Sequence, residues 1–177
     1  MVSENDVLLA QRGDKRAFVR LIDSCEQSLY RVSKGILKED SDCADAIQET
    51  ILKSYKSITK LKKPTYFKTW ITRILINECY DLLRKRSKVI PMESLEEQLP
   101  DTGYNDSYFL ELSDSLSKID YKHRVVLTLF YFEDFSIKEI STILKIREGT
   151  VKSRLNRART KLSSLLEMEE RRLENGE

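Results

Sequence analysis

Apolar residues recur along most of the chain at the three- and four-residue spacing of an amphipathic helix, and no segment sustains the apolar–polar alternation of a strand. This spacing favours an all-α protein. In the first half it predicts helices over residues 6–33, 42–58 and 67–86, with a break at Gly13-Asp14 and a polar loop at 59–66.

Each of these predicted helices has an apolar face that we expect to be buried. In 6–33 this face consists of Phe18, Leu21, Ile22, Cys25, Leu29 and Val32. In 42–58 it consists of Ala44, Ile47, Ile51 and Tyr55, and in 67–86 of Trp70, Ile71, Ile74, Leu75, Leu82 and Leu83. The other side of the second helix is polar and acidic, with Asp42, Asp45, Gln48 and Glu49.

The C-terminal part of the chain has the pattern of a helix-turn-helix. Helices are expected over 108–118, 122–132, 136–144 and from 149 onward. Ser136 and Glu139 form the S-x-x-E pattern of a capping box, which satisfies free backbone amides at a helix start. The last helix is expected to pack through Val151, Leu155, Ala158 and Leu162.

Breaker residues divide the chain into two parts. Pro91, Pro100 and Gly103 lie in an acidic stretch at 88–107, which we interpret as a flexible linker. It separates an N-terminal helical domain at 1–87 from a C-terminal domain at 108–177. With 177 residues and 40% apolar content, the chain is long enough for two small helical cores.

Charge is unevenly distributed, although Lys and Arg total 31 against 29 Asp and Glu. Residues 50–77 contain seven bases and no acid, and residues 145–161 contain seven bases and one acid. A solvated surface explains single lysines, but two nearly acid-free blocks fit a polyanionic partner better. Nucleic acid is therefore the expected partner.

The basic blocks carry residue types that suit nucleic acid. In the last helix Arg, Asn and Ser can read base edges in the major groove, while Lys152 and Lys161 suit phosphates. In the first block Tyr66 and Phe67 fit either a surface that stacks on unpaired bases or the core. The lysines beside them, which suit phosphates, are Lys60, Lys62, Lys63 and Lys68. Arg73, Asn77 and Arg84 share one helix face, which we expect to contact nucleic acid.

The sequence does not support a metalloprotein, an enzyme, or a membrane or secreted protein. Cys25, Cys43 and Cys79 have neither disulfide nor zinc spacing, and no cofactor or metal is expected. The single His123 has no catalytic partner in sequence, so an enzyme with a small-molecule substrate is not expected. The longest apolar run, 125–132, is too short for a membrane span, and the acidic N-terminus is unlike a secretory signal. We therefore expect a cytosolic protein.

Three motifs in order resemble the extracytoplasmic-function group of bacterial RNA polymerase sigma factors over residues 4–168. They are DCADAIQETILKSY, FKTWITRILINECYDLLRK and, most specific, FSIKEISTILKIREGTVKSRLNRARTKL, preceded near the start by QRGDKRAFVRLI. Ile119-Asp120 and Ser141 depart from the Leu-Pro and Ala of many relatives, and we expect only local packing changes there.

The resemblance implies a protein that binds core RNA polymerase and selects promoter DNA. By similarity, Asp42, Asp45, Gln48 and Glu49 lie in the segment that docks on the clamp of the largest subunit. The loop at 57–68, with Arg73 and Asn77, would read and help melt the −10 element. Gly149, Thr150, Lys152, Ser153, Arg154 and Arg157 fall in the −35 reading helix, on which we expect Asn156 to be exposed as well. An anti-sigma factor, which can hold such a protein at the membrane, is expected from the family.

Two alternatives remain at this stage. A dimeric helix-turn-helix repressor or activator would bind a palindromic site, because the symmetry of its operator matches its own. A helical adaptor would instead use its bases to bind an acidic protein and would bind no DNA.

Overall fold

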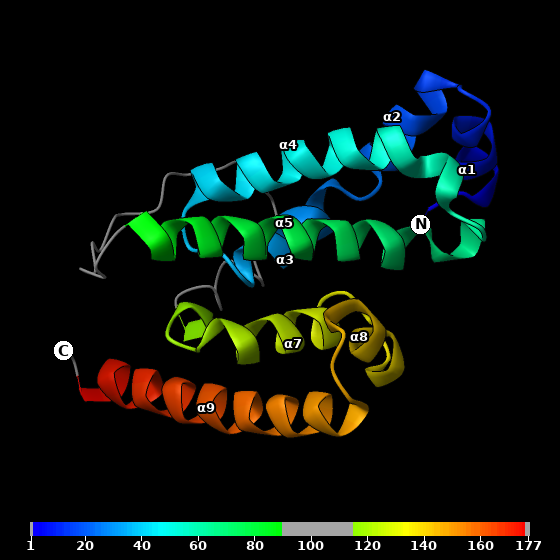
Figure 1. Ribbon diagram of the computed structural model, residues 1–177. Coiled ribbons are helices and arrows are strands. Elements are labelled where there is room, and N and C mark those ends of the chain that lie inside the picture. Colours follow the sequence, from blue (N-terminus) through cyan, green and yellow to red (C-terminus); the bar gives the residue numbers. More distant parts are fainter. Residues whose placement is uncertain (1, 90–114, 176–177) are drawn as a thin grey trace. The chain divides into compact units, whose positions relative to one another are not determined.

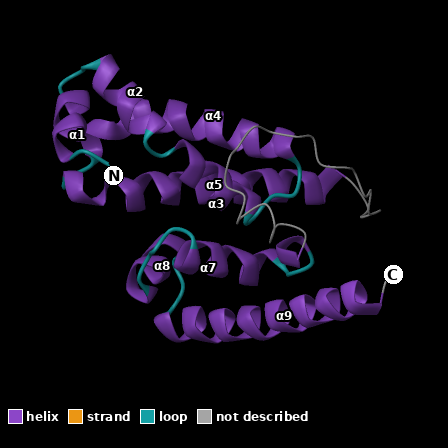
Figure 2. Ribbon diagram, turned by 180° about the vertical axis from the view of Figure 1, so that it is seen from behind, coloured by secondary structure: helices purple, strands orange, loops and turns teal. Residues whose placement is uncertain are grey.

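The computed structural model describes residues 2–89 and 115–175 and consists of two compact units, Met1–Gly103 and Tyr104–Glu177. Every regular element in these described ranges is a helix, which confirms the all-α class (Figure 1 and Figure 2). Within the same ranges no helix is long and apolar enough to cross a membrane.

The first unit begins with α1, Glu4–Gln11, and α2, Lys15–Asp23. The break predicted between them is confirmed. Gly13 has a φ of +96°, in the left-handed region that glycine enters without steric cost. The next residue caps α2, because a carboxylate oxygen of Asp14 accepts a hydrogen bond from the Ala17 amide at 3.0 Å.

The rest of the first unit contains α3 (Glu26–Lys34), α4 (Asp40–Ser57), the 3₁₀ turns η1 (Ile58–Lys60) and η2 (Pro64–Tyr66), and α5 (Phe67–Val89). α4 and α5 lie side by side, and α3 packs against both (Figure 1). The apolar face predicted over 6–33 is confirmed: Ile22 is half-buried and its other five members are buried.

The buried face of α4 differs from the prediction. Ala44 and Tyr55 are exposed, whereas Ile47 and Ile51 are half-buried. The residues that α4 buries are small or polar: Asp42, Cys43, Ala46, Thr50 and Ser54. Small side chains allow two helix backbones to approach closely, which favours this face for packing.

The two buried hydroxyls of this face are satisfied within α4 itself. Thr50 Oγ1 donates to the Ala46 carbonyl at 2.7 Å, and Ser54 Oγ donates to the Ile51 carbonyl at 2.9 Å. A buried hydroxyl is costly only when it lacks a partner. Polar residues can therefore occupy a face that hydrophobicity alone assigns to solvent.

α5 buries Ile71 and Leu75 of its predicted stripe, whereas Trp70, Ile74, Leu82 and Leu83 are half-buried. Its buried face also includes Cys79, and all three cysteines of the chain are buried and form no disulfide. Burial raises the pKa of the Cys43 thiol to about 11, and it raises the pKa of Cys79 as well. These thiols are therefore protonated at neutral pH.

The second unit contains α7 (Tyr121–Tyr131), α8 (Ile137–Leu144) and α9 (Glu148–Asn175). Its core includes Leu116, Ile119, Leu127 and Ala158, with Phe132, Leu162 and Leu165 packed against it. Of the helix predicted at 108–118, only 115–118 is described, and 115–117 is helical. The predicted linker at 88–107 overlaps α5 by two residues, and from 90 onward it lies outside the described residues.

The dipeptide that departs from the family pattern has a local role. Ile119 is buried in the core of the second unit. Asp120 caps α7, since its carboxylate accepts a hydrogen bond from the Lys122 amide at 2.9 Å. The buried Arg124 stabilises the same turn by donating to the Ile119 carbonyl at 3.2 Å.

Candidate nucleic-acid and protein interfaces

The lysine-rich loop lies between α4 and α5 and includes η1 and η2. Its apolar residues Ile58 and Leu61 are buried, whereas Lys60, Lys62 and Lys63 are exposed. The loop is thus anchored by apolar side chains and presents ammonium groups to solvent. This arrangement suits contacts to a phosphate backbone.

Two adjacent aromatic residues, Tyr66 in this loop and Phe67 at the start of α5, differ in exposure. Tyr66 is 53% exposed, and the Lys63 ammonium lies 5.9 Å from the centre of its ring. Phe67 is fully buried and packs against Trp70 with ring centres 5.9 Å apart. The inclusion of Phe67 in the DNA-contacting set was therefore wrong, because its ring is part of the core. Tyr66 keeps an accessible face for stacking.

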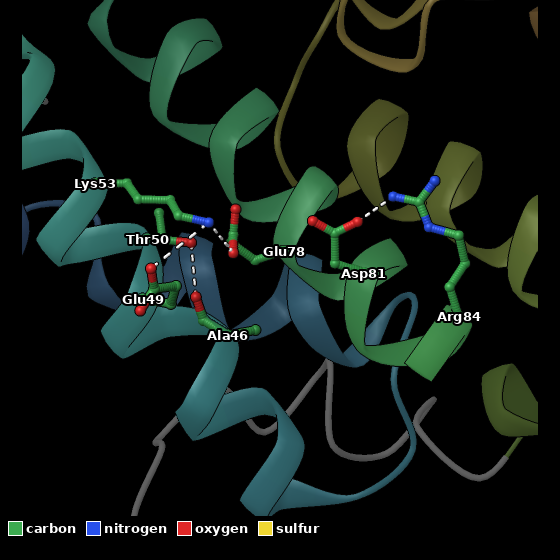
Figure 3. A network of polar contacts seen from close by, with 7 residues as sticks. All are labelled: Ala46, Glu49, Thr50, Lys53, Glu78, Asp81 and Arg84. Atoms are coloured by element: carbon green, nitrogen blue, oxygen red, sulfur yellow. Dashed lines mark hydrogen bonds and ion pairs between the residues drawn. The ribbon is translucent and has the colours of Figure 1, made fainter. Parts of the chain in front are cut away.

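Most of the predicted DNA face of α5 is exposed, and its binding role stays a prediction. Arg73, Asn77 and Arg84 are exposed, and Lys68 at the start of the helix is half-buried. Arg84 forms an ion pair with Asp81, one turn earlier on the same helix (Figure 3). Part of its charge is therefore neutralised within α5, whereas Arg73 and Asn77 lie nearer the lysine-rich loop in sequence.

Three of the four residues predicted for the acidic face of α4 are exposed. Asp45, Gln48 and Glu49 are exposed, but Asp42 is buried and pairs with Arg86, Nη2 to Oδ1, at 2.7 Å. Burial raises the pKa of Asp42, and Arg86 opposes this shift. Asp42 is therefore a structural contact and not part of a docking face.

The remaining three residues line a groove of about 500 Å³ between α4 and α5. α4 also contributes Leu52, which is 53% exposed. The residues that α5 contributes are Glu78, Asp81, Leu82 and Lys85, none of which we assigned to a docking face from sequence. No local pattern identifies them, because the groove exists only once the two helices pack.

Lys53 connects the two walls of this groove (Figure 3). Its ammonium lies 2.6 Å from Glu78 Oε2 on α5 and 3.6 Å from Glu49 Oε1 on α4. The hydrogen bond to Glu78 raises the pKa of Lys53. Although Lys53 belongs to the acid-free block in sequence, the structure pairs its charge with carboxylates of the groove.

The second unit forms the predicted helix-turn-helix from α8 and α9. The capping box is confirmed: Ser136 Oγ accepts from the Glu139 amide at 3.3 Å, and Glu139 accepts from the Ser136 amide at 2.9 Å. Lys145, with a φ of 54°, ends α8. Ser141, which departs from the family pattern, bridges the turn by donating its hydroxyl to the Ile146 carbonyl at 2.6 Å.

α9 packs as predicted, with Val151, Leu155 and Ala158 buried and Leu162 half-buried. Of the seven predicted reading residues, Thr150 and Arg154 are half-buried, and Gly149, Lys152, Ser153, Asn156 and Arg157 are exposed. A side chain at Gly149 would meet open space, so the fold itself does not require glycine there. Close approach of a ligand backbone is one reason for a glycine at such a position.

Arg159 lies on the same helix but contacts the protein. Its guanidinium is 5.9 Å from the ring centre of Phe130 and 5.5 Å from that of Tyr131. Cation–π contacts of this kind hold an arginine against its own unit. We therefore keep Arg159 outside the candidate reading set.

Both units match known protein families. Residues 21–89 match "Sigma-70 region 2", and residues 109–162 match "Sigma-70, region 4". The chain is 31% identical over 145 residues to the RNA polymerase sigma factor SigV of Bacillus subtilis, which covers 81% of this chain and 87% of that protein. It is 29% identical over 167 residues to the ECF RNA polymerase sigma factor SigM of Mycobacterium tuberculosis strain H37Rv, covering 93% and 85%.

Two solved structures share the fold. One is CnrH in complex with the cytosolic domain of CnrY, with a TM-score of 0.69, 24% identity and coverage of 95% of this chain and 99% of that one. The other is the sigma factor RpoE in complex with the anti-sigma factor NepR from Bartonella quintana, with a TM-score of 0.70, 24% identity and coverage of 85% and 96%.

Proposed function

Because this chain belongs to the extracytoplasmic-function group of the sigma-70 family, we propose that its two units read the two elements of a promoter while the first unit also binds the polymerase. The chain is an alternative sigma factor: it binds core RNA polymerase and directs transcription initiation. The assignment of particular residues to these contacts is our proposal.

The second unit reads the −35 element through α9. The support is that five of the seven predicted residues are exposed at the start of this helix, after a capped and well-defined turn. A recognition helix contacts base edges with its N-terminal residues. Arg157 and Asn156 carry base contacts in this proposal, and Lys152 carries a phosphate contact.

The first unit binds the separated strand of the −10 element. Its exposed lysines neutralise phosphates, and Tyr66 stacks on an unpaired base. Arg73 and Asn77 extend this surface along α5. What supports this proposal is the exposure of Tyr66 beside cations, together with the burial of the residues that anchor the loop.

The groove between α4 and α5 receives the polymerase. Four carboxylates line it against the two ammonium groups of Lys53 and Lys85, so its net charge is negative, and the exposed Leu52 gives it an apolar contact. A helix with basic residues and an apolar ridge complements such a surface. The clamp of the largest subunit is the proposed partner.

One geometric observation supports separate polymerase-binding and DNA-binding faces on α5. At 100° per residue, the centre of the groove-lining set (Glu78, Asp81, Leu82 and Lys85) lies about 110° around the helix from the centre of the set Arg73, Asn77 and Arg84. Polymerase and DNA therefore contact different faces of one helix. Both can bind at once, as initiation requires.

Further properties follow from this proposal. The polymerase carries out nucleotide chemistry, so the chain itself acts by binding and not as an enzyme. Its partner polymerase places its activity in the cytoplasm. One relative in fold was solved with an anti-sigma factor, and we propose that a protein of that class covers these interfaces when the factor is inactive.

The test combines polymerase binding with promoter selection. Purified chain is mixed with core RNA polymerase, and the fractions that co-elute in size-exclusion chromatography are used for run-off transcription from a pooled promoter library. Co-elution with selective initiation is the expected result. Failure to bind core polymerase, with dimeric binding to palindromic DNA instead, would favour a repressor, an alternative against which the region 2 match already counts.

A further inference from the structure

Gln11, the last residue of α1, reaches across the first unit to the lysine-rich loop. Its side-chain nitrogen Nε2 donates hydrogen bonds to the Ile58 carbonyl at 3.0 Å and to the Leu61 carbonyl at 2.7 Å. These partners lie 47 and 50 residues away in sequence. One amide group therefore contacts the backbone at both ends of η1.

The two carbonyls that Gln11 binds belong to the buried anchors of the loop. Ile58 is 3% exposed and Leu61 is 8% exposed. The Leu61 amide also donates to the Ile58 carbonyl at 3.1 Å, which closes η1. The exposed Lys60 lies between these anchors, and Lys62 and Lys63 follow them. The backbone that Gln11 holds is thus the backbone that directs these ammonium groups.

A three-residue 3₁₀ turn does not hold its shape by itself. It contains one internal hydrogen bond, and short turns of this kind depend on tertiary contacts. A glutamine amide has two N–H groups, and here each can serve one carbonyl. Because the amide is planar, it fixes the spacing between the two carbonyls and with it the curvature of the loop.

We propose that Gln11 is a positioning residue for recognition of the −10 element. It does not contact DNA; it holds η1 so that Lys60, Lys62 and Lys63 meet the phosphates and Tyr66 meets an unpaired base. This inference rests on the proposed function of the loop. It assigns to α1 a part in promoter selectivity that its sequence does not suggest.

The test uses Gln11→Met, which removes both donors but keeps length and neutrality. Gln27→Met, at an exposed position of α3, is the matched control. Run-off transcription compares the cognate promoter with variants altered at the −10 or at the −35 element. We expect Gln11→Met to reduce discrimination among −10 variants about three- to tenfold, as the loss of two hydrogen bonds allows. Discrimination among −35 variants and polymerase affinity should not change.

A rescue separates positioning from a general loss of fold. Gln11→Lys restores donors that can reach the same carbonyls, so −10 discrimination should return; Gln27→Lys controls for the added charge. The inference would be overturned if Gln11→Met kept wild-type −10 discrimination, or if it lowered −10 and −35 readouts equally along with thermal stability. If the wild-type chain itself does not discriminate among −10 variants, the proposed function of the loop fails instead.

Discussion

The guanidinium of Arg86 lies 2.7 Å from the carboxylate of Asp42 and joins the end of α5 to the first turn of α4. The two partners differ in environment, since 12% of the Asp42 side chain is exposed but 53% of the Arg86 side chain. Loss of either partner thus has a different consequence. An unpaired arginine would be solvated, whereas an unpaired carboxylate would remain largely buried.

The first prediction follows from this asymmetry. Arg86→Ala should lower the free energy of unfolding by about 1–3 kcal/mol, because it leaves a buried charge without its partner. Asp42→Asn should cost less, because it removes the charge that needs compensation. Denaturant unfolding of both variants measures the difference. Equal losses would show that the pair contributes only as a symmetric surface contact.

The same pair predicts a pH dependence. Burial raises the pKa of Asp42 above its ordinary value of 3.8, and Arg86 opposes this shift. A carboxyl group whose pKa is raised in the folded state stabilises that state at low pH. This stabilisation is lost as pH rises through the pKa of the folded state. Without Arg86 the pKa rises further, so the stability gap between wild type and Arg86→Ala should widen from pH 3 upward. A gap that is independent of pH would contradict this account.

The second prediction contrasts two adjacent aromatic residues. Tyr66→Ala should weaken binding to single-stranded −10 DNA by about 1–3 kcal/mol and leave stability nearly unchanged, because Tyr66 is exposed. Phe67→Ala should instead destabilise the unit by about 3–5 kcal/mol, because its ring is fully buried. Thermal unfolding and fluorescence anisotropy with labelled DNA distinguish them. Normal stability of Phe67→Ala would refute its place in the core.

The third prediction separates two lysines of the same sequence block. Lys62→Gln should reduce the slope of log affinity against log salt for single-stranded DNA by about 0.7, the value for one phosphate contact. Lys53→Gln should leave that slope unchanged, because its ammonium is paired with Glu78 at 2.6 Å. Lys53→Gln should also lower the free energy of unfolding by up to about 1 kcal/mol. Salt titrations of both variants provide the measurement.

The fourth prediction uses two arginines of α9. Arg157→Ala should reduce discrimination at the −35 element by about 1–3 kcal/mol, because an arginine that reads base edges is lost. Arg159→Ala should retain that discrimination, since its guanidinium faces Phe130 and Tyr131. Competition binding with mutated −35 duplexes measures both. Unchanged discrimination in Arg157→Ala would remove this residue from the reading set.

The fifth prediction tests the groove between α4 and α5. Asp45→Lys reverses a charge at its edge and should lower polymerase affinity at least about tenfold, the range seen when like charges face each other in an interface. Asp23→Lys makes the same charge change at an exposed position of α2 and serves as control. Titration against labelled core polymerase gives both affinities. Equal affinities would show that the docking surface lies elsewhere.

The sequence by itself determined the helical class and the internal packing of the helix-turn-helix. The spacing of Val151, Leu155 and Ala158 identified the buried side of α9, because their hydrophobicity and the helical period indicate the same face. The Ser136–Glu139 capping box was equally predictable, since its partners are three residues apart. Local signals suffice where the interacting groups are neighbours in sequence.

Only the tertiary structure decided which side of α4 is buried. Hydrophobicity favoured the face with Ile47 and Ile51, but the packed face carries Thr50 and Ser54, whose hydroxyls bond within the helix. Residues distant in sequence also decided which charged side chains remain available to bind a partner. Lys53 is paired with Glu78, 25 residues away, and Asp42 with Arg86, 44 residues away. Such pairs depend on how α4 and α5 pack, which no local pattern encodes.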